Sequence, residues 1–88
     1  MNCIHFSGQV ATAPFETGLG EFCLILIGMK TGLDKEPVEF PVKFFADRQI
    51  GQDLSRLCSP GDRMIVRGRL DYLDGYKLIL EDFELSSI

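Results

Sequence analysis

Three arginines at odd-numbered positions of one short segment carry the clearest chemical signal in this sequence. They lie in residues 62–71, a segment with the period of two that is typical of a β-strand. They are Arg63, Arg67 and Arg69. On a strand these side chains share one face, and guanidinium groups in a row are suited to contact phosphates. The alternative is a solvated strand face balanced by acids such as Asp71 and Glu81. The sequence leaves both interpretations open.

The usual catalytic and metal-binding patterns are absent from the sequence. His5 is the only histidine, and Cys3, Cys23 and Cys58 are widely spaced, with no C-x-x-C pair. This predicts neither a disulfide framework nor a zinc site, and we expect three reduced, buried thiols. The chain has no Walker-type loop, H-E-x-x-H helix or nucleophile elbow. We therefore expect no catalytic residue, no metal, no cofactor and no enzyme.

The composition predicts one small globular domain, residues 1–88. Of the 88 residues, 45% are hydrophobic and 25% are charged, which argues against a disordered chain. Nine basic and thirteen acidic residues give a net charge of −4, so bulk charge does not attract a polyanion. The charge is segregated, however, because residues 62–70 hold three arginines and one acid. A localised basic surface on an acidic body is therefore compatible with a polyanionic ligand.

The location of the protein is predicted from the absence of two kinds of apolar segment. The first ten residues lack the basic start and apolar core of a signal peptide. The longest apolar run, residues 22–27, is too short to span a bilayer. We therefore expect a cytoplasmic protein with no membrane partner.

The spacing of apolar residues divides the chain into five strands and one helix. Strands are predicted at residues 2–12, 21–30, 38–46, 62–71 and 76–85. Residues 47–57 change to helical spacing, with Asp47 as the N-cap. Turns are expected at residues 13–20, 31–37 and 72–75, the last ending in Asp74-Gly75. The order predicts an all-β fold, a five-stranded Greek-key barrel of the OB type with the helix between strands 3 and 4.

Three details of these elements lead to further expectations. Residues 22–27 are apolar without alternation, which predicts a strand covered on both faces, and a second subunit could supply one cover. Pro41 cannot donate to a ladder, which indicates a sheet edge or a bulge. Gly51 weakens the helix by about 1 kcal/mol relative to Ala, so the helix should be short and depend on docking.

Four segments together resemble the bacterial single-stranded DNA-binding (SSB) proteins. The opening Met-Asn-x-Ile-x-Phe-x-Gly-x-Val is similar to the first strand of that family, and residues 40–46, Phe-Pro-Val-Lys-Phe-Phe-Ala, are similar to its third strand. A short helix follows. Residues 60–70 resemble the family's signature of Gly, a polar residue, alternating apolar residues and a final Gly-Arg-Leu. The chain most resembles the short, acidic SSB-like members of cyanobacteria and plastids.

The resemblance implies an OB-fold module that binds single strands without sequence preference. Such binding combines a basic groove with aromatic faces on which bases stack. By position the family's basic residue and stacking aromatic are Lys43 and Phe45, while Tyr76 and Lys77 extend the surface and Tyr72 is ambiguous. The first strand of the family often packs between subunits. The implied oligomer interface contains Cys3, His5 and Ser7.

The sequence also departs from the family pattern. It has no Trp, it places Glu39 where a second outward aromatic is common, and its last hairpin is short. A carboxylate in a nucleic-acid groove repels phosphate, and the net charge predicts localised, salt-sensitive binding.

Two functions are therefore weighed. The first is binding of single-stranded DNA, or RNA, in replication, repair or recombination, through Lys43, Phe45, Arg63, Arg67, Arg69, Tyr76 and Lys77. Its implied partners are further copies of the chain, in a homodimer or homotetramer, and replication or repair proteins. Its implied location is the cytoplasm, at the nucleoid, or a plastid. The second is an OB-fold protein-interaction or assembly module that has lost most nucleic-acid binding.

Overall fold

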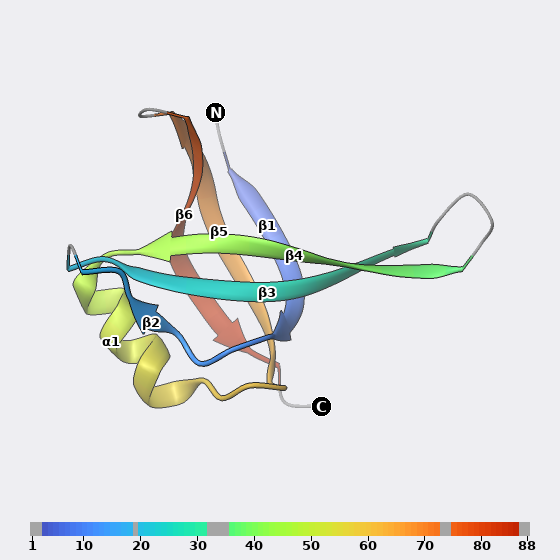
Figure 1. The fold of residues 1–88 in the computed structure, drawn as a ribbon, viewed down its shortest axis with the longest axis horizontal. Helices are drawn as coiled ribbons and strands as arrows, with labels where there is room; N and C mark the ends of the chain where they lie inside the picture. Colours follow the sequence, from blue (N-terminus) through green and yellow to red (C-terminus); the bar gives the residue numbers. More distant parts are fainter. Residues whose placement is uncertain (1–2, 19, 32–35, 73–74, 87–88) are drawn as a thin grey trace.

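The segments of period two form one sheet that closes on itself. The computed structural model describes residues 3–18, 20–31, 36–72 and 75–86. The elements in chain order are β1 (Ile4–Val10), β2 (Phe15–Glu16), β3 (Phe22–Thr31), β4 (Pro37–Ala46), α1 (Arg48–Leu57), β5 (Arg63–Tyr72) and β6 (Tyr76–Leu85) (Figure 1). Each of the five long strands lies within about two residues of a predicted strand. Among the described residues, no helix is long and apolar enough to cross a membrane.

The barrel is closed by two pairings between strands that are distant in sequence. The sheet order is β1-β5-β6-β4-β3-β2, and β1 also pairs with β3. β4 and β6 pair in parallel at Phe45 and Ile79, whereas the other pairings are antiparallel. The five long strands therefore form the OB-type barrel that the sequence predicts. The helix follows the third long strand, as expected, and lies between β4 and β5 once the short β2 is counted.

The short strand β2 corrects the prediction of a plain turn over residues 13–20. Phe15 and Glu16 pair with Cys23 and Phe22 at the start of β3. Two residues are too few to produce a period in the sequence, so only the pairing reveals this strand. Residue 19 of the same predicted turn, residues 32–35 and residues 73–74, which include Asp74, lie outside the described residues. Gly75 has a φ of 121°, a conformation that favours glycine.

The barrel interior is filled by the inward residues of every long strand. The buried core contains Val10, Leu24, Leu26, Phe44, Ala46, Met64, Val66 and Leu80, joined by Leu54 of α1 and by Cys58. Helix α1 begins as predicted, because the Asp47 side chain accepts a hydrogen bond from the Ile50 N–H at 2.9 Å. A Cβ on Gly51 would lie 2.2 Å from ring carbons of Phe22. The glycine therefore allows the helix to dock on β3, at a cost in helix propensity.

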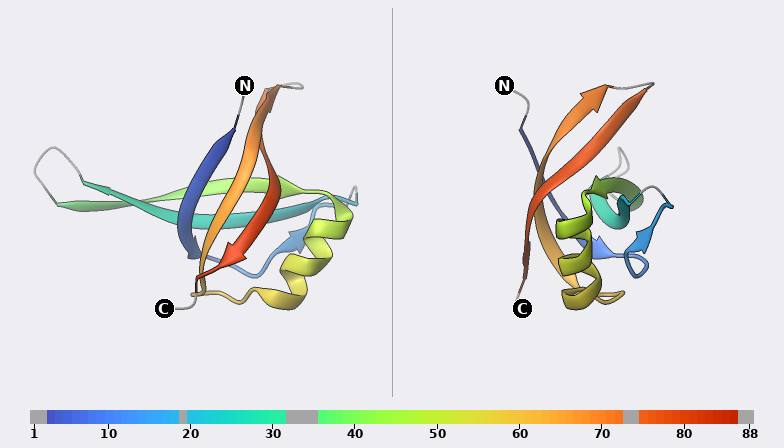
Figure 2. Two further views of the ribbon diagram at one scale, coloured as in Figure 1. Left: turned by 180° about the vertical axis from the view of Figure 1, so that it is seen from behind. Right: turned by 90° about the vertical axis from the view of Figure 1, so that its left-hand side faces the viewer.

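The strands form two layers that cross at a large angle (Figure 2). One layer contains β1, β5 and β6, and the other contains β3 and β4, whose far end projects beyond the barrel (Figure 1). The ladder of β5 and β6 shifts register between Arg67 and Gly68. A Cβ at Gly68 would lie 2.1 Å from the carbonyl oxygen of Ile79, so the two strands approach closely only because this residue is glycine.

Pro41 and residues 22–27 behave largely as their sequence suggests. Pro41 pairs with Ile27 of β3, in a part of β4 that has no second partner strand among the described residues. On β3, Leu24 and Leu26 are buried in the core, and Cys23 is buried on the outward side. Ile25 and Ile27 are only partly buried. The outward face of β3, which was expected to be covered, is therefore fully buried at Cys23 and only partly buried at Ile25 and Ile27.

Candidate nucleic-acid interface

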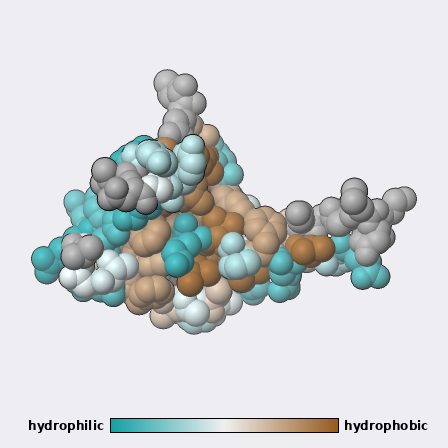
Figure 3. All heavy atoms as spheres, turned by 45° about the horizontal axis from the view of Figure 1, so that its top comes forward, coloured by the Kyte–Doolittle hydropathy of each residue, from teal (hydrophilic) through white to brown (hydrophobic). Residues whose placement is uncertain are grey.

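A shallow groove lies between the outer surface of β4 and the β5–β6 hairpin. Its volume is about 400 Å³, and its lining residues are Lys43, Phe45, Leu70, Tyr76, Lys77 and Leu78. Figure 3 looks onto this side of the molecule and shows apolar surface between the hairpin and the projecting end of β3 and β4. The groove thus combines apolar walls with aromatic rings and two lysines.

The alternation of β4 places Lys43 and Phe45 in this groove. Phe44 and Ala46 point into the core and are buried, so the residues between and before them point outward. Lys43 lies opposite Ile25 of β3, and its side chain is exposed. Lys43 makes no ion pair with any residue that the structure describes. It is therefore a cation available to an anionic ligand.

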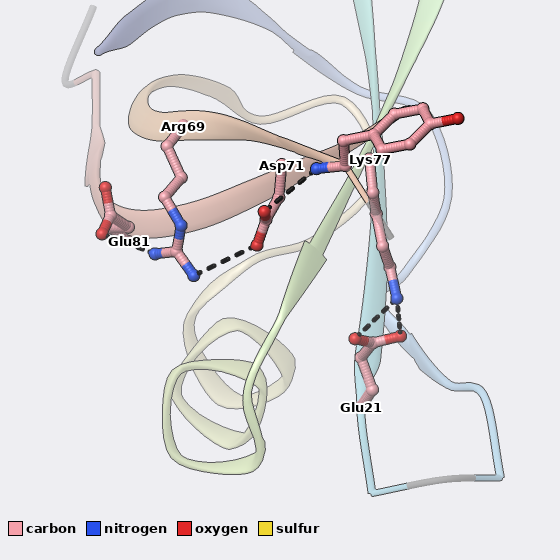
Figure 4. A network of polar contacts seen from close by, with 6 residues as sticks. Glu21, Arg69, Asp71, Lys77 and Glu81 are labelled. Atoms are coloured by element: carbon pink, nitrogen blue, oxygen red, sulfur yellow. Dashed lines mark hydrogen bonds and ion pairs between the residues drawn. The ribbon is translucent and has the colours of Figure 1, made fainter. Parts of the chain in front are cut away.

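Lys77 also lies in the groove, but its charge is already paired. Its Nζ donates to both carboxylate oxygens of Glu21, at 2.7 and 2.9 Å (Figure 4). The same Nζ lies 4.3 Å from the centre of the Phe45 ring, which is cation–π geometry. The ammonium group is therefore held between an acid and an aromatic face.

Two exposed tyrosines lie together on the β5–β6 hairpin, and one of them, Tyr76, lines the groove. The residues of Tyr72 and Tyr76 are 67% and 77% exposed, and their ring centroids are 5.0 Å apart in an edge-to-face arrangement. They face each other because they are directly opposed across the hairpin. The sequence alone did not decide whether Tyr72 belongs to the binding surface. Its position four residues before Tyr76, across a tight turn, could have indicated that the two side chains are cross-strand neighbours.

Arg67 and Arg69 lie on the outer face of β5, where acids of the neighbouring strand neutralise them. Arg67 pairs with Asp82, the residue directly opposite on β6. Arg69 contacts Glu81 at 2.8 Å and Asp71 at 3.7 Å (Figure 4). The hydrogen bond between Arg67 and Asp82 raises the pKa of the guanidinium and lowers that of the carboxyl. This geometry favours the interpretation of a charge-balanced strand face.

Arg63 differs from the other two arginines. It is exposed and makes no ion pair within the described part of the chain. It lies opposite Gln9 of β1 and, with Ile27, Met29 and Glu39, lines a small pocket near the projecting end of β3 and β4. The predicted site residues are therefore divided: Lys43, Phe45, Tyr76 and Lys77 meet in the groove, whereas the three arginines do not line it.

Of the residues predicted for an oligomer interface, His5 and Ser7 lie on the outward face of β1, and Cys3 lies just before this strand. Cys3, His5 and Ser7 are all exposed, and His5 lies opposite Arg67. The expectation that all three cysteines are buried is wrong for Cys3, which lies before the first residue of β1 and outside the core. Cys23 and Cys58 are buried, and burial raises the pKa of both thiols. Within the described residues, no group of three potential ligands could hold a metal ion.

Solved structures of known proteins share this fold. No family model matches the chain, and no curated protein shows significant similarity to it. The chain is similar to a small single-stranded DNA-binding protein of Streptomyces coelicolor, with a TM-score of 0.73 and 21% identity over 98% of this chain and 95% of that one. It is also similar to the Plasmodium falciparum SSB, solved in complex with single-stranded DNA, with a TM-score of 0.77 and 17% identity over 99% and 96% of the two chains. A small single-stranded DNA-binding protein of Mycoplasma pneumoniae gives a TM-score of 0.73 at 11% identity, over 96% and 92%.

These similarities extend over nearly the whole of each chain. At such low identities they define the class of fold, an OB barrel of the form found in single-stranded DNA-binding proteins.

Proposed function

We propose that this protein binds single-stranded DNA without sequence preference and is not an enzyme. The observation that carries the proposal is the groove in which the aromatic ring of Phe45 and the unpaired ammonium of Lys43 lie side by side on an OB barrel. Three structural neighbours are single-stranded DNA-binding proteins, and one of them was solved with its DNA. The role would lie in replication, repair or recombination.

The groove suits bases better than it suits a long run of phosphates. Phe45 and Tyr76 supply rings on which bases stack, each worth about 1–3 kcal/mol. Leu70 and Leu78 add apolar wall between them. Lys43 supplies the phosphate contact, whereas the other lysine is neutralised by Glu21. Stacking should therefore provide most of the affinity, and RNA, which presents the same base faces, is a second ligand to test.

Assembly into a homodimer or homotetramer is part of the same proposal. The candidate interface is the outward face of β1, with exposed His5 and Ser7, together with Cys3 just before the strand. Ile65, opposite Ser7 on β5, is a large hydrophobic side chain that is exposed. Light scattering tests this point, and a strict monomer contradicts it. A cytoplasmic location and replication or repair proteins as partners follow from the proposed role.

A titration of fluorescent oligo-dT at low salt tests the function. The wild type should bind the single strand and leave a duplex of the same length unbound. Phe45→Ala should weaken binding by roughly tenfold or more, because it removes one stacking ring. Leu57→Ala on α1 truncates an exposed apolar side chain that lies outside the groove, and this variant should bind like the wild type. Absence of binding by the wild type at low salt rejects the proposal.

One observation favours a second candidate function, that of a protein-interaction module with the OB fold. Three of the five predicted cationic site residues, Arg67, Arg69 and Lys77, are already paired with acids. A surface with its charges neutralised internally attracts polyanions weakly and can be buried against a protein at a lower electrostatic cost. The titration decides between the two candidates, since an interaction module would not discriminate single strand from duplex.

A further inference from the structure

The contact between Glu21 and Lys77 is the most enclosed ion pair of the described residues. Their side chains are only 29% and 34% exposed, whereas those of Asp82 and Arg67 are 55% and 57% exposed. An ion pair shielded in this way is screened less by salt than one on the open surface. Both carboxylate oxygens accept from the same ammonium group, at 2.7 and 2.9 Å, so the pairing is bidentate.

Backbone contacts hold the acid in place. The carbonyl oxygen of Glu21 accepts hydrogen bonds from the backbone N–H of Thr17 at 2.8 Å and from its hydroxyl at 3.1 Å. The next residue, Phe22, is fixed in register between Ala46 and Glu16. Glu21 thus lies at the end of a turn that is fixed by hydrogen bonds to Thr17. Its partner, Lys77, belongs to β6 and lies 56 residues away in the chain. The contact joins the β2–β3 connection to Lys77 at the start of β6 (Figure 4), and Lys77 lines the groove.

The ammonium group of Lys77, held in this way, covers a face of the Phe45 ring. Its Nζ lies 4.3 Å from the ring centre, and a base needs a free ring face to stack. The ammonium is also less available to phosphate, because both carboxylate oxygens accept from it and their negative charge neutralises it. One acid therefore affects both binding elements of the groove.

We infer that Glu21 is a positioning residue that holds Lys77 on the Phe45 ring and withholds it from phosphate, so that this carboxylate limits affinity for single-stranded nucleic acid. The inference rests on the proposed function and adds a residue that sequence analysis did not select. A phosphate that approaches the groove competes with Glu21 for the ammonium. Of the described residues that line the groove, Lys43 is then the one cation left to neutralise phosphate.

The buried thiol of Cys23 gives a readout of this contact that needs no DNA. Cys23 lies opposite both Phe45 and Phe15 in the sheet and is 1% exposed. Its thiol lies close enough to Lys43, Glu21 and Lys77 for their charges to act on it. Besides burial, the Glu21 carboxylate raises the pKa of this thiol, so its removal should make Cys23 more reactive toward alkylating reagents.

Four proteins test the inference in titrations of oligo-dT at several salt concentrations: wild type, Glu21→Gln, Lys77→Gln and the double variant. Glu21→Gln should bind roughly threefold to tenfold more tightly at low salt, because a nearby negative charge is removed. Its log–log salt slope should steepen by about 0.7, the value for one more neutralised phosphate on a single strand. Lys77→Gln alone should leave the slope unchanged, and the double variant should return to the wild-type slope.

Glu16→Gln is the matched control, since it removes the same charge from an exposed residue of β2, outside the groove. It should change neither the slope nor the rate at which Cys23 is alkylated, whereas Glu21→Gln should raise that rate severalfold and leave Cys58 unaffected. If Glu21→Gln fails to tighten binding, or if Lys77→Gln alone flattens the slope, the inference is wrong. If no variant binds DNA, the proposed function fails instead, and an unchanged Cys23 rate in Glu21→Gln then shows separately that the carboxylate does not act at this end of the groove, which also overturns the inference.

Discussion

Phe45 of β4 lies directly opposite Ile79 of β6, in the parallel pairing that closes the barrel. The same pairing brings the β5–β6 hairpin beside the Phe45 ring, so closing the barrel also builds the groove. Closure and the candidate binding surface therefore depend on the same pair of strands. This relationship makes the role of the Phe45 side chain open to a direct test.

Two substitutions separate stacking by Phe45 from simple packing. Phe45→Tyr keeps an aromatic face and should bind oligo-dT within about threefold of the wild type, whereas Phe45→Leu keeps apolar volume and should lose about tenfold or more. Anisotropy titrations measure the affinities, and thermal unfolding shows whether both variants remain folded. Equal binding by the two variants would mean that Phe45 only packs.

The salt dependence of binding should identify the cations that contact phosphate. Lys43 has no ion pair among the described residues, so Lys43→Gln should flatten the log–log salt slope by about 0.7. Arg67→Gln and Arg69→Gln remove guanidinium groups already paired with acids and should leave the slope unchanged. A slope that responds to the arginines instead would place the DNA on the β1–β5–β6 layer.

Gly51→Ala should destabilise the protein even though alanine is the better helix former. The propensity gain is about 1 kcal/mol, but the new Cβ would lie 2.2 Å from the Phe22 ring. Overpacking of this kind costs about 1–3 kcal/mol and should lower Tm by several degrees. Gln52→Ala, at the exposed neighbouring position, is the control. A higher Tm for Gly51→Ala would show that the helix does not dock tightly on β3.

The contact between Arg67 and Asp82 predicts part of the acid sensitivity of the fold. Its hydrogen bond lowers the pKa of Asp82 in the folded state, so below about pH 4 the unfolded chain binds more protons at this residue. The stabilisation is present above the usual aspartate pKa of about 3.9 and is lost as the pH falls through the lowered value. Asp82→Asn should therefore lose less stability than the wild type between pH 7 and pH 3 in urea denaturation. Identical losses would contradict this assignment.

Local patterns predicted most of the fold because strand and helix periods are local properties. The alternation of residues 38–46 correctly placed Lys43 and Phe45 on the outward face, and Asp47 caps the helix as expected. The glycine at position 51 is explained only by the tertiary structure, because the ring of Phe22 on β3 leaves no room for a Cβ there.

The pairing of the charges could not be predicted because it depends on register between strands. Arg67 lies opposite Asp82 because the β5–β6 ladder shifts register between Arg67 and Gly68, and Arg69 contacts Glu81, which lies at that shift. Glu21 and Lys77 are 56 residues apart and have no sequence pattern that links them. Net charge therefore indicated localised binding, whereas the structure indicates which cations remain available for it.

Tyrosine fluorescence gives the most direct test of the claim that single-stranded DNA binds in the groove. The chain has no Trp, and its two tyrosines, Tyr72 and Tyr76, lie together on the hairpin that forms one wall of the groove. Titration with unlabelled oligo-dT at low salt should quench their emission in a saturable way, with the same midpoint as the anisotropy titration. Binding detected by anisotropy without any change in tyrosine emission would place the DNA elsewhere and contradict the account.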